Sequence, residues 1–131
     1  MSFGTLKADT LTHSTAGSLA TNFVVEGSAK IWVNFDGQTS DGIRGSFNFS
    51  SFTDNGTGDY TLNYTNSMAN GNYSLVTMSN KGSQSDSVRL CNFITDSSGP
   101  ATGSCRVGHG HATNSATDST HIHADVHGDL A

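Results

Sequence analysis

The sequence predicts an all-β protein, specifically an antiparallel β-sandwich of about seven to eight short strands. Ser (19), Thr (16), Gly (15) and Asn (11) make up nearly half of the 131 residues. This composition disfavours helices, because Ser, Thr and Asn side chains compete for backbone hydrogen bonds and Gly loses much entropy on folding. Aromatic residues lie in alternating runs, and turn signals recur roughly every 8–12 residues with no helical period of useful length.

The clearest predicted strand covers residues 30–35. Here Ile31, Val33 and Phe35 alternate with more polar positions, as expected for a strand that buries one face. Trp32 lies between them. Exposed aromatic rings beside Asn and Asp would suit a carbohydrate surface, but aromatic residues in strands most often serve packing. We therefore interpret Trp32 as a core residue, and the same two interpretations apply to Tyr60, Tyr64 and Tyr73.

The other strands follow in order along the chain. Phe47, Phe49 and, after a bulge or bend, Phe52 alternate with Ser and Asn residues. Tight turns are expected at Asn55–Gly56 and Asn70–Gly71, since Asn and Gly tolerate positive φ. Alternating runs predict further strands over residues 60–64, 73–77, 88–94, 104–107 and 120–126.

The spacing of apolar residues divides the chain into two regions. In residues 1–28, apolar residues such as Leu11, Leu19 and Phe23 are spaced loosely among Ser, Thr and Ala. This region is predicted to be an N-terminal arm with a short strand or two, which contacts a neighbouring subunit or a larger particle. The alternative is an ordinary first strand of the same domain. Residues 29–131 are predicted to form the β-sandwich module.

Charge excludes several function classes. The net charge is −5 with only six Lys and Arg residues, and no basic patch is visible, so no nucleic-acid partner is expected. Attraction to an anionic membrane is equally unsupported, and no apolar run is long enough for membrane insertion. The first residues lack a secretory signal pattern, so synthesis in a cytoplasm is expected.

Two cysteines leave the redox chemistry open. Cys91 and Cys105 enclose a loop that contains Pro100. If they lie on paired strands, a disulfide can form; otherwise they are two reduced, half-buried thiols.

Histidines near the C-terminus form the main candidate for chemistry. In residues 121–127 the period is strictly two, so one face of a strand carries His121, His123, Asp125 and His127, and the other carries Ile122, Ala124 and Val126. A second pair, His109 and His111, lies upstream among glycines. Both pairs together would be needed to complete a tetrahedral metal site within one chain. Alternatively the row faces solvent or a subunit groove, or it responds to pH because clustered histidines charge near pH 6.

No enzyme is expected from this sequence. It contains neither a G-x-S-x-G nucleophile elbow nor a Gly-rich phosphate loop ending in Lys-Ser or Lys-Thr. Glu26 is the single Glu, and most Asp residues fall at turns, where Asp caps its own backbone. No catalytic residue is therefore assigned.

The stretch Ala29 to Asn66 carries a more specific signal. An A-K-x-W-V-N-F opening leads through a Gly-rich turn and an S-F-N-x-S-S strand to T-D-N-G-T-G-D-Y-T. This run resembles the β-rich modules near the ends of bacteriophage tail-fibre and related virion adhesin proteins. The resemblance implies a homotrimer in a virion, which contacts other tail or capsid proteins and binds a host surface glycan or outer-membrane component by multivalent display.

The same resemblance bears on the histidines. Fibre and spike tips of this kind bind iron through His-x-His pairs at a three-fold axis, where three copies supply six imidazoles. It therefore implies iron or another transition metal at a trimer axis, held by His121 and His123 or by His109 and His111.

Two rival functions remain. One is a structural virion component, such as a head fibre, a capsid decoration or a tail cement protein, without receptor binding. The other is a small metal- or sugar-binding lectin with no virion role.

Overall fold

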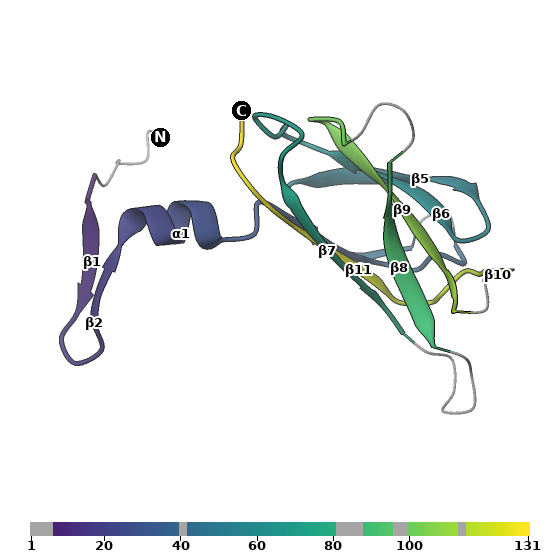
Figure 1. The fold of residues 1–131 in the computed structure, drawn as a ribbon, viewed down its shortest axis with the longest axis horizontal. Helices are drawn as coiled ribbons and strands as arrows, with labels where there is room; N and C mark the ends of the chain where they lie inside the picture. Colours follow the sequence, from purple (N-terminus) through teal and green to yellow (C-terminus); the bar gives the residue numbers. More distant parts are fainter. Residues whose placement is uncertain (1–6, 40–41, 81–87, 96–99, 113–114) are drawn as a thin grey trace.

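The computed structural model describes residues 7–39, 42–80, 88–95, 100–112 and 115–131. Antiparallel strands dominate these residues, in agreement with the predicted all-β class. Figure 1 shows an N-terminal part that stands away from a larger body of β-strands. The body contains β3 (Ile31–Phe35), β4 (Ile43–Phe47), β5 (Phe49–Gly56), β6 (Asp59–Tyr64), β7 (Ser74–Ser79), β8 (Arg89–Ile94), β9 (Ser104–His111), β10 (Ser115–Ala116) and β11 (Ile122–His127).

The strands of the body form two sheets. The four-stranded sheet has the order β4-β3-β11-β7. In the five-stranded sheet, β6 pairs with β5 on one side and with β9 on the other. Strand β8 lies on the far edge of β9, since residues 106–108 of β9 pair with both β6 and β8. Strand β10 continues the β6 side of β9.

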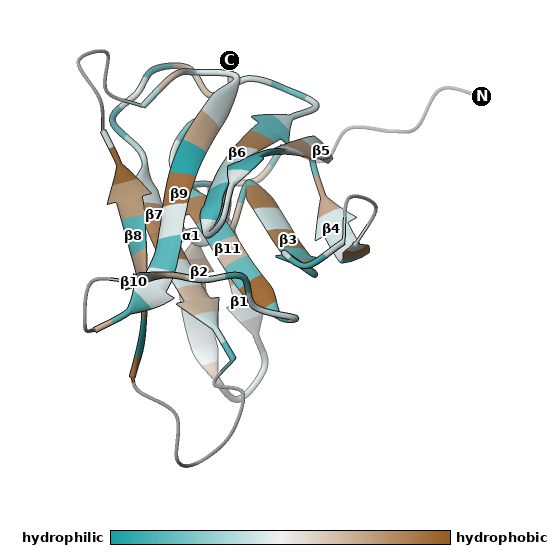
Figure 2. Cartoon of the chain, turned by 90° about the vertical axis from the view of Figure 1, so that its right-hand side faces the viewer, coloured by the Kyte–Doolittle hydropathy of each residue, from teal (hydrophilic) through white to brown (hydrophobic). Residues whose placement is uncertain are grey.

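The core lies between the inward faces of the two sheets. The predicted alternation in residues 30–35 is confirmed, because Ile31, Val33 and Phe35 are all buried while the residues between them are less so. The ring of Phe35 packs against those of Phe52 and Tyr60, at centroid distances of 4.7 and 5.2 Å. Bands of alternating hydropathy are visible along β3 and β9 in Figure 2. The buried apolar residues are Ile31, Val33, Phe35, Phe49, Tyr60, Leu62, Tyr64, Met68, Cys105, Val107, Ile122, Ala124 and Val126.

The predicted alternation of Phe47 and Phe49 along one strand is wrong, whereas the bulge predicted before Phe52 is confirmed by a register shift between Phe49 and Ser51. The chain changes sheets at Asn48, whose φ is +52°, so that β4 belongs to one sheet and β5 to the other. The Asn48 side chain holds this corner, because its Oδ1 accepts hydrogen bonds of 2.8 Å from both the backbone N and the Nδ2 of Asn66. As a result Phe49 is buried, whereas Phe47 lies on an outer face.

The first tight turn lies two residues later than predicted. Strand β5 extends through Asn55 and Gly56, and the loop to β6 consists of Thr57 and Gly58. A register shift between Asp54 and Gly56 explains the displacement, because a bulge lets one strand continue past a residue pair that would otherwise form the turn.

The N-terminal part, residues 7–27, is called the arm from here on. It consists of the hairpin β1 (Thr10–His13) and β2 (Gly17–Ala20), followed directly by α1 (Thr21–Gly27). The sequence pattern did not indicate this helix, whose seven residues are too few for a clear helical period. Neither α1 nor any other helix in the described residues has the length and apolar character needed to cross a membrane.

The two cysteine thiols are unbridged. On β8 and β9, Cys91 lies opposite His109, four residues away from Cys105 along β9. Cys105 instead faces Leu62 across β6 and β9 and belongs to the core. Burial raises the pKa of the Cys105 thiol to about 11, so this thiol stays protonated at neutral pH.

Candidate functional site

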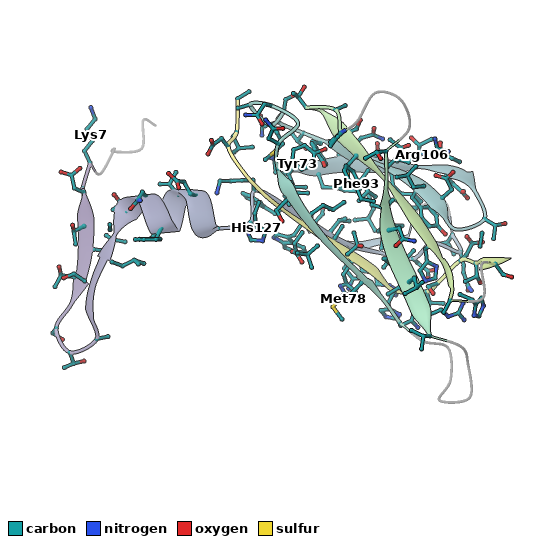
Figure 3. All side chains as sticks on the ribbon, in the orientation of Figure 1. Lys7, Tyr73, Met78, Phe93, Arg106 and His127 are labelled. Carbon is teal, nitrogen blue, oxygen red and sulfur yellow. The ribbon has the colours of Figure 1, made fainter. Side chains whose placement is uncertain are left out.

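The outer side of the four-stranded sheet carries large apolar side chains. Trp32 and Phe47 lie opposite each other on β3 and β4, and Val76 and Met78 lie on β7. The interpretation of Trp32 as a core residue is wrong, since its side chain is 40% exposed. These four residues are called the apolar face. Figure 3 shows Met78 projecting outward from β7.

The predicted histidine row lies in the middle of this face. His123 pairs with Asn34 on β3 and with Met78 on β7, and Asp125 pairs with Trp32 and Val76 in the next row. The opposite side of β11 is buried as predicted. His123 is exposed, and His127 and Asp125 are half-buried.

His121 precedes the strand. Its backbone N donates to the Asn80 side-chain Oδ1 at 3.0 Å, and its carbonyl accepts from the Asn80 backbone N at 2.9 Å. Among the residues that the structure describes, no three or more His, Cys, Asp or Glu side chains gather as a metal-binding group.

His109 and His111 lie on β9, and both have engaged ring nitrogens. The Nδ1 of His109 hydrogen-bonds the Thr117 carbonyl, which can only accept, so Nδ1 carries the proton. Nε2 is then an acceptor. The Ser119 hydroxyl lies 3.3 Å from both this nitrogen and the Asn80 carbonyl oxygen, so the two acceptors share its single proton. The Nε2 of His111 accepts from the Arg89 guanidinium at 2.9 Å, because Arg has no acceptor.

His109 is a neutral core residue. Burial lowers its pKa from the usual value, the nearby Arg89 and His111 lower it further, and the Thr117 hydrogen bond and Asp118 act in the opposite direction. Its position could have been anticipated, since it shares strand parity with Cys105 and Val107.

Acidification is expected to weaken the fold through His109. The pKa of His109 in the folded state lies below the unfolded value of ~6.5. The stability that this difference contributes is therefore present above about pH 6.5 and is lost as the pH falls through the folded pKa. For one proton, the free energy of unfolding changes by no more than about 1.4 kcal/mol per pH unit. Urea unfolding from about pH 8 to pH 5 measures this loss. His109→Asn should flatten it, whereas the exposed control His123→Asn should not. An unchanged dependence in His109→Asn would contradict the assignment.

A depression of about 480 Å³ opens on the outer side of the five-stranded sheet. Its floor is the backbone of Gly108 and Gly110 on β9, which carry no side chains. Cross-strand pairing builds the walls: Asn92 and Asp59 lie on either side of Gly108, and Leu90 and Ala116 on either side of Gly110. Ile94 also lines the depression. The two floor glycines and these five wall residues define what is called the groove.

An ion pair lies beside one end of the groove. Arg106 donates from Nε to Asp59 Oδ1 at 2.8 Å and from Nη2 to Oδ2 at 2.6 Å, a two-point contact between a guanidinium and a carboxylate. The hydrogen bond from Arg106 lowers the pKa of Asp59, so the carboxylate stays ionised. Figure 3 shows Arg106 on the side of the body away from the arm.

The groove combines chemistries that suit a neutral polar ligand. Leu90 and Ile94 offer apolar contact, while Asn92 offers an amide that both donates and accepts. Concave sites with apolar walls and a few placed polar groups are typical small-molecule sites. No sequence pattern predicts this groove, and the Gly-rich run around residue 110 is interpreted from sequence only as the surroundings of two histidines.

Comparison with known proteins finds no matching family, no matching curated protein and no matching solved structure. The functional argument therefore depends on the residues and geometry described above.

Proposed function

We propose that this protein is a bacteriophage virion protein, a fibre or fibre-tip module that attaches the particle to the host cell surface by multivalent binding. The groove on the five-stranded sheet is the observation that carries this proposal, because it supplies an outward-facing binding site. The fibre-like sequence from Ala29 to Asn66 supports the virion assignment.

In this proposal the body is an antiparallel β-sandwich and the functional unit is a homotrimer. The core shared by both sheets supports the sandwich. Three grooves per unit would turn weak single contacts into firm attachment, because the second and third contacts form at high effective concentration.

The proposed ligand is a host surface glycan. A sugar ring presents C–H groups that can pack on Leu90 and Ile94, and hydroxyls that can bond the Asn92 amide and the Asp59 carboxylate. A glycine floor allows the ring to approach the backbone of β9 closely.

A metal at the trimer axis would use His121 and His123. His121 lies just before the start of β11, and His123 is the second residue of that strand and is exposed. The pair His109 and His111 is the weaker candidate, since binding a metal would require breaking the hydrogen bonds to Ser119 and Arg89.

Filling the groove is expected to reduce glycan binding. In Gly108→Ser the new Cβ would lie 3.1 Å from the terminal methyl of Ile94, which can rotate away, so the fold should persist. Binding to an array of bacterial surface polysaccharides and to host cells should weaken by about tenfold or more, ~1.4 kcal/mol. The control Gly103→Ser places its Cβ in ordinary contact, 3.6 Å from Ser67 Oγ, and should bind normally. Equal binding by both variants would refute the groove as the site.

A structural virion component is the second candidate. The arm favours it, because its exposed apolar side chains suit attachment to another protein. Particles that lack this protein would then adsorb normally but lose physical stability, whereas the attachment proposal expects lost adsorption.

A further inference from the structure

The arm leaves its own apolar side chains uncovered. Leu11 and Leu19 pair across β1 and β2, and Phe23, Val24 and Val25 follow on α1. All five are exposed, Phe23 by 64%. A two-stranded hairpin and a seven-residue helix have little stability alone. The arm therefore requires a covering partner to stay ordered.

Lys30 sets the direction of the arm. Its Nζ donates to the carbonyl oxygens of Val25 and Ser28 at the end of α1. Its backbone N donates to the Val126 carbonyl of the four-stranded sheet at 2.8 Å. Lys30 is 9% exposed, so these contacts are largely shielded from solvent. It holds the arm pointing away from the body, as Figure 1 shows.

The apolar face is the second uncovered surface of this chain. Met78 is 67% exposed, and Trp32 and Phe47 stand beside each other at the other side of the sheet. Asn34 Oδ1, in the same face, is buried without a hydrogen-bond partner among the described residues. His123 and Asp125 of β11 divide this face, so its apolar surface has two parts, Trp32 with Phe47 and Val76 with Met78. At ~150–250 Å² for a whole aromatic side chain, the two parts together expose on the order of several hundred Å².

The two surfaces share apolar character. A hollow of about 460 Å³ lies between the hairpin and the helix of the arm, with Leu11, Val24 and Val25 in its lining. The protruding Met78 side chain offers an apolar group that can enter it. In a reciprocally exchanged pair, two such contacts belong to one interface and together would bury on the order of the ~1,200 Å² at which stable interfaces begin.

We infer that the arm of one copy of this chain packs on the apolar face of the next copy. Such a contact joins two different surfaces, so it forms a closed ring, a reciprocally exchanged pair or an open filament, depending on the rotation between copies. The inference is independent of what the groove binds. An arm in this position and a shared metal cannot both occupy the surroundings of His123, and the inference assigns that space to the arm.

Disulfide trapping between separately made variants tests this contact. One preparation carries Val24→Cys, at a position that lines the hollow, and the other carries Met78→Cys; they are mixed, allowed to exchange and oxidised. A cross-linked species that requires both variants is expected. The matched control replaces Met78→Cys with Thr53→Cys, an exposed position on the outer side of the other sheet. The unmodified chain, oxidised in parallel, measures any background from Cys91 and Cys105.

Light scattering on the unmodified chain and on Val24→Glu gives the second readout. The unmodified chain should be oligomeric, and Val24→Glu should raise the dissociation concentration by at least about tenfold, while Thr53→Glu should not. A monomeric unmodified chain would overturn the inference. So would equal trapping through Thr53→Cys, or a disulfide confined to one chain in a Val24→Cys/Met78→Cys double variant. Glycan binding retained by a monomer would leave the groove standing while this inference fails.

Discussion

Gly58→Ala is expected to lower the free energy of unfolding by about 3 kcal/mol or more, from combined backbone strain and steric overlap. Gly58 has a φ of +68°, and a Cβ at this position would overlap the His109 carbonyl oxygen. The surrounding backbone cannot yield easily. The Gly58 carbonyl accepts from the His109 N, and its N donates to Asp118 Oδ1 at 2.7 Å.

A neighbouring glycine provides the control. Gly56 has a φ of +134°, but no atom of the described residues would lie within 4 Å of a methyl group added there. Gly56→Ala therefore carries strain alone, about 1–3 kcal/mol. Urea unfolding at one fixed protein concentration compares the two. If Gly58→Ala lowers the free energy of unfolding no more than Gly56→Ala does, then close packing of the β5–β6 loop against β9 does not contribute to stability here.

Ile122→Ala is expected to cost about 2–5 kcal/mol, the range for truncating a large aliphatic side chain in a core. Ile122 is fully buried on β11 and pairs with Phe35 on β3 and Ser79 on β7. Removing its side chain leaves a cavity under the first residue of the central strand β11, where both neighbouring strands are held by ladder hydrogen bonds and can collapse only partly.

Ile43→Ala makes the same chemical change on the edge strand β4, where Ile43 is 41% exposed. Its expected cost is within about 1 kcal/mol, since surface positions contribute little. The two variants compared by urea unfolding separate burial from the β-preference of isoleucine, which both lose equally. A similar cost at both positions would mean that Ile122 does not lie in the core.

Alternation identified the core faces of β3 and β11 correctly. Ile31 and Phe35 on one strand, and Ile122 and Val126 on the other, follow a period of two that any strand must have. That inference needs only local geometry. The same argument failed for Phe47 and Phe49, because the positive φ of Asn48 breaks the strand and moves its two halves into different sheets.

For the histidines too, sequence spacing predicts the side of the strand but not the hydrogen-bond partners. Their spacing correctly placed His123 and Asp125 on one side of β11, but spacing could not show that the hydrogen bonds of His109 come from Thr117 and Ser119. Those partners reach His109 only because residues 115–119 fold back along β9.

Sequence pattern was sufficient for the all-β class, for most strands and for the buried side of β3 and β11, because strand formation and side-chain alternation are local properties. The groove depends on how distant strands pair. Asp59, Asn92 and Gly108 lie in one row through pairings of β6 and β8 with β9 that no local signal encodes. Hydrogen-bond register and sheet packing are long-range choices, and here they determine which apolar and polar side chains reach the surface.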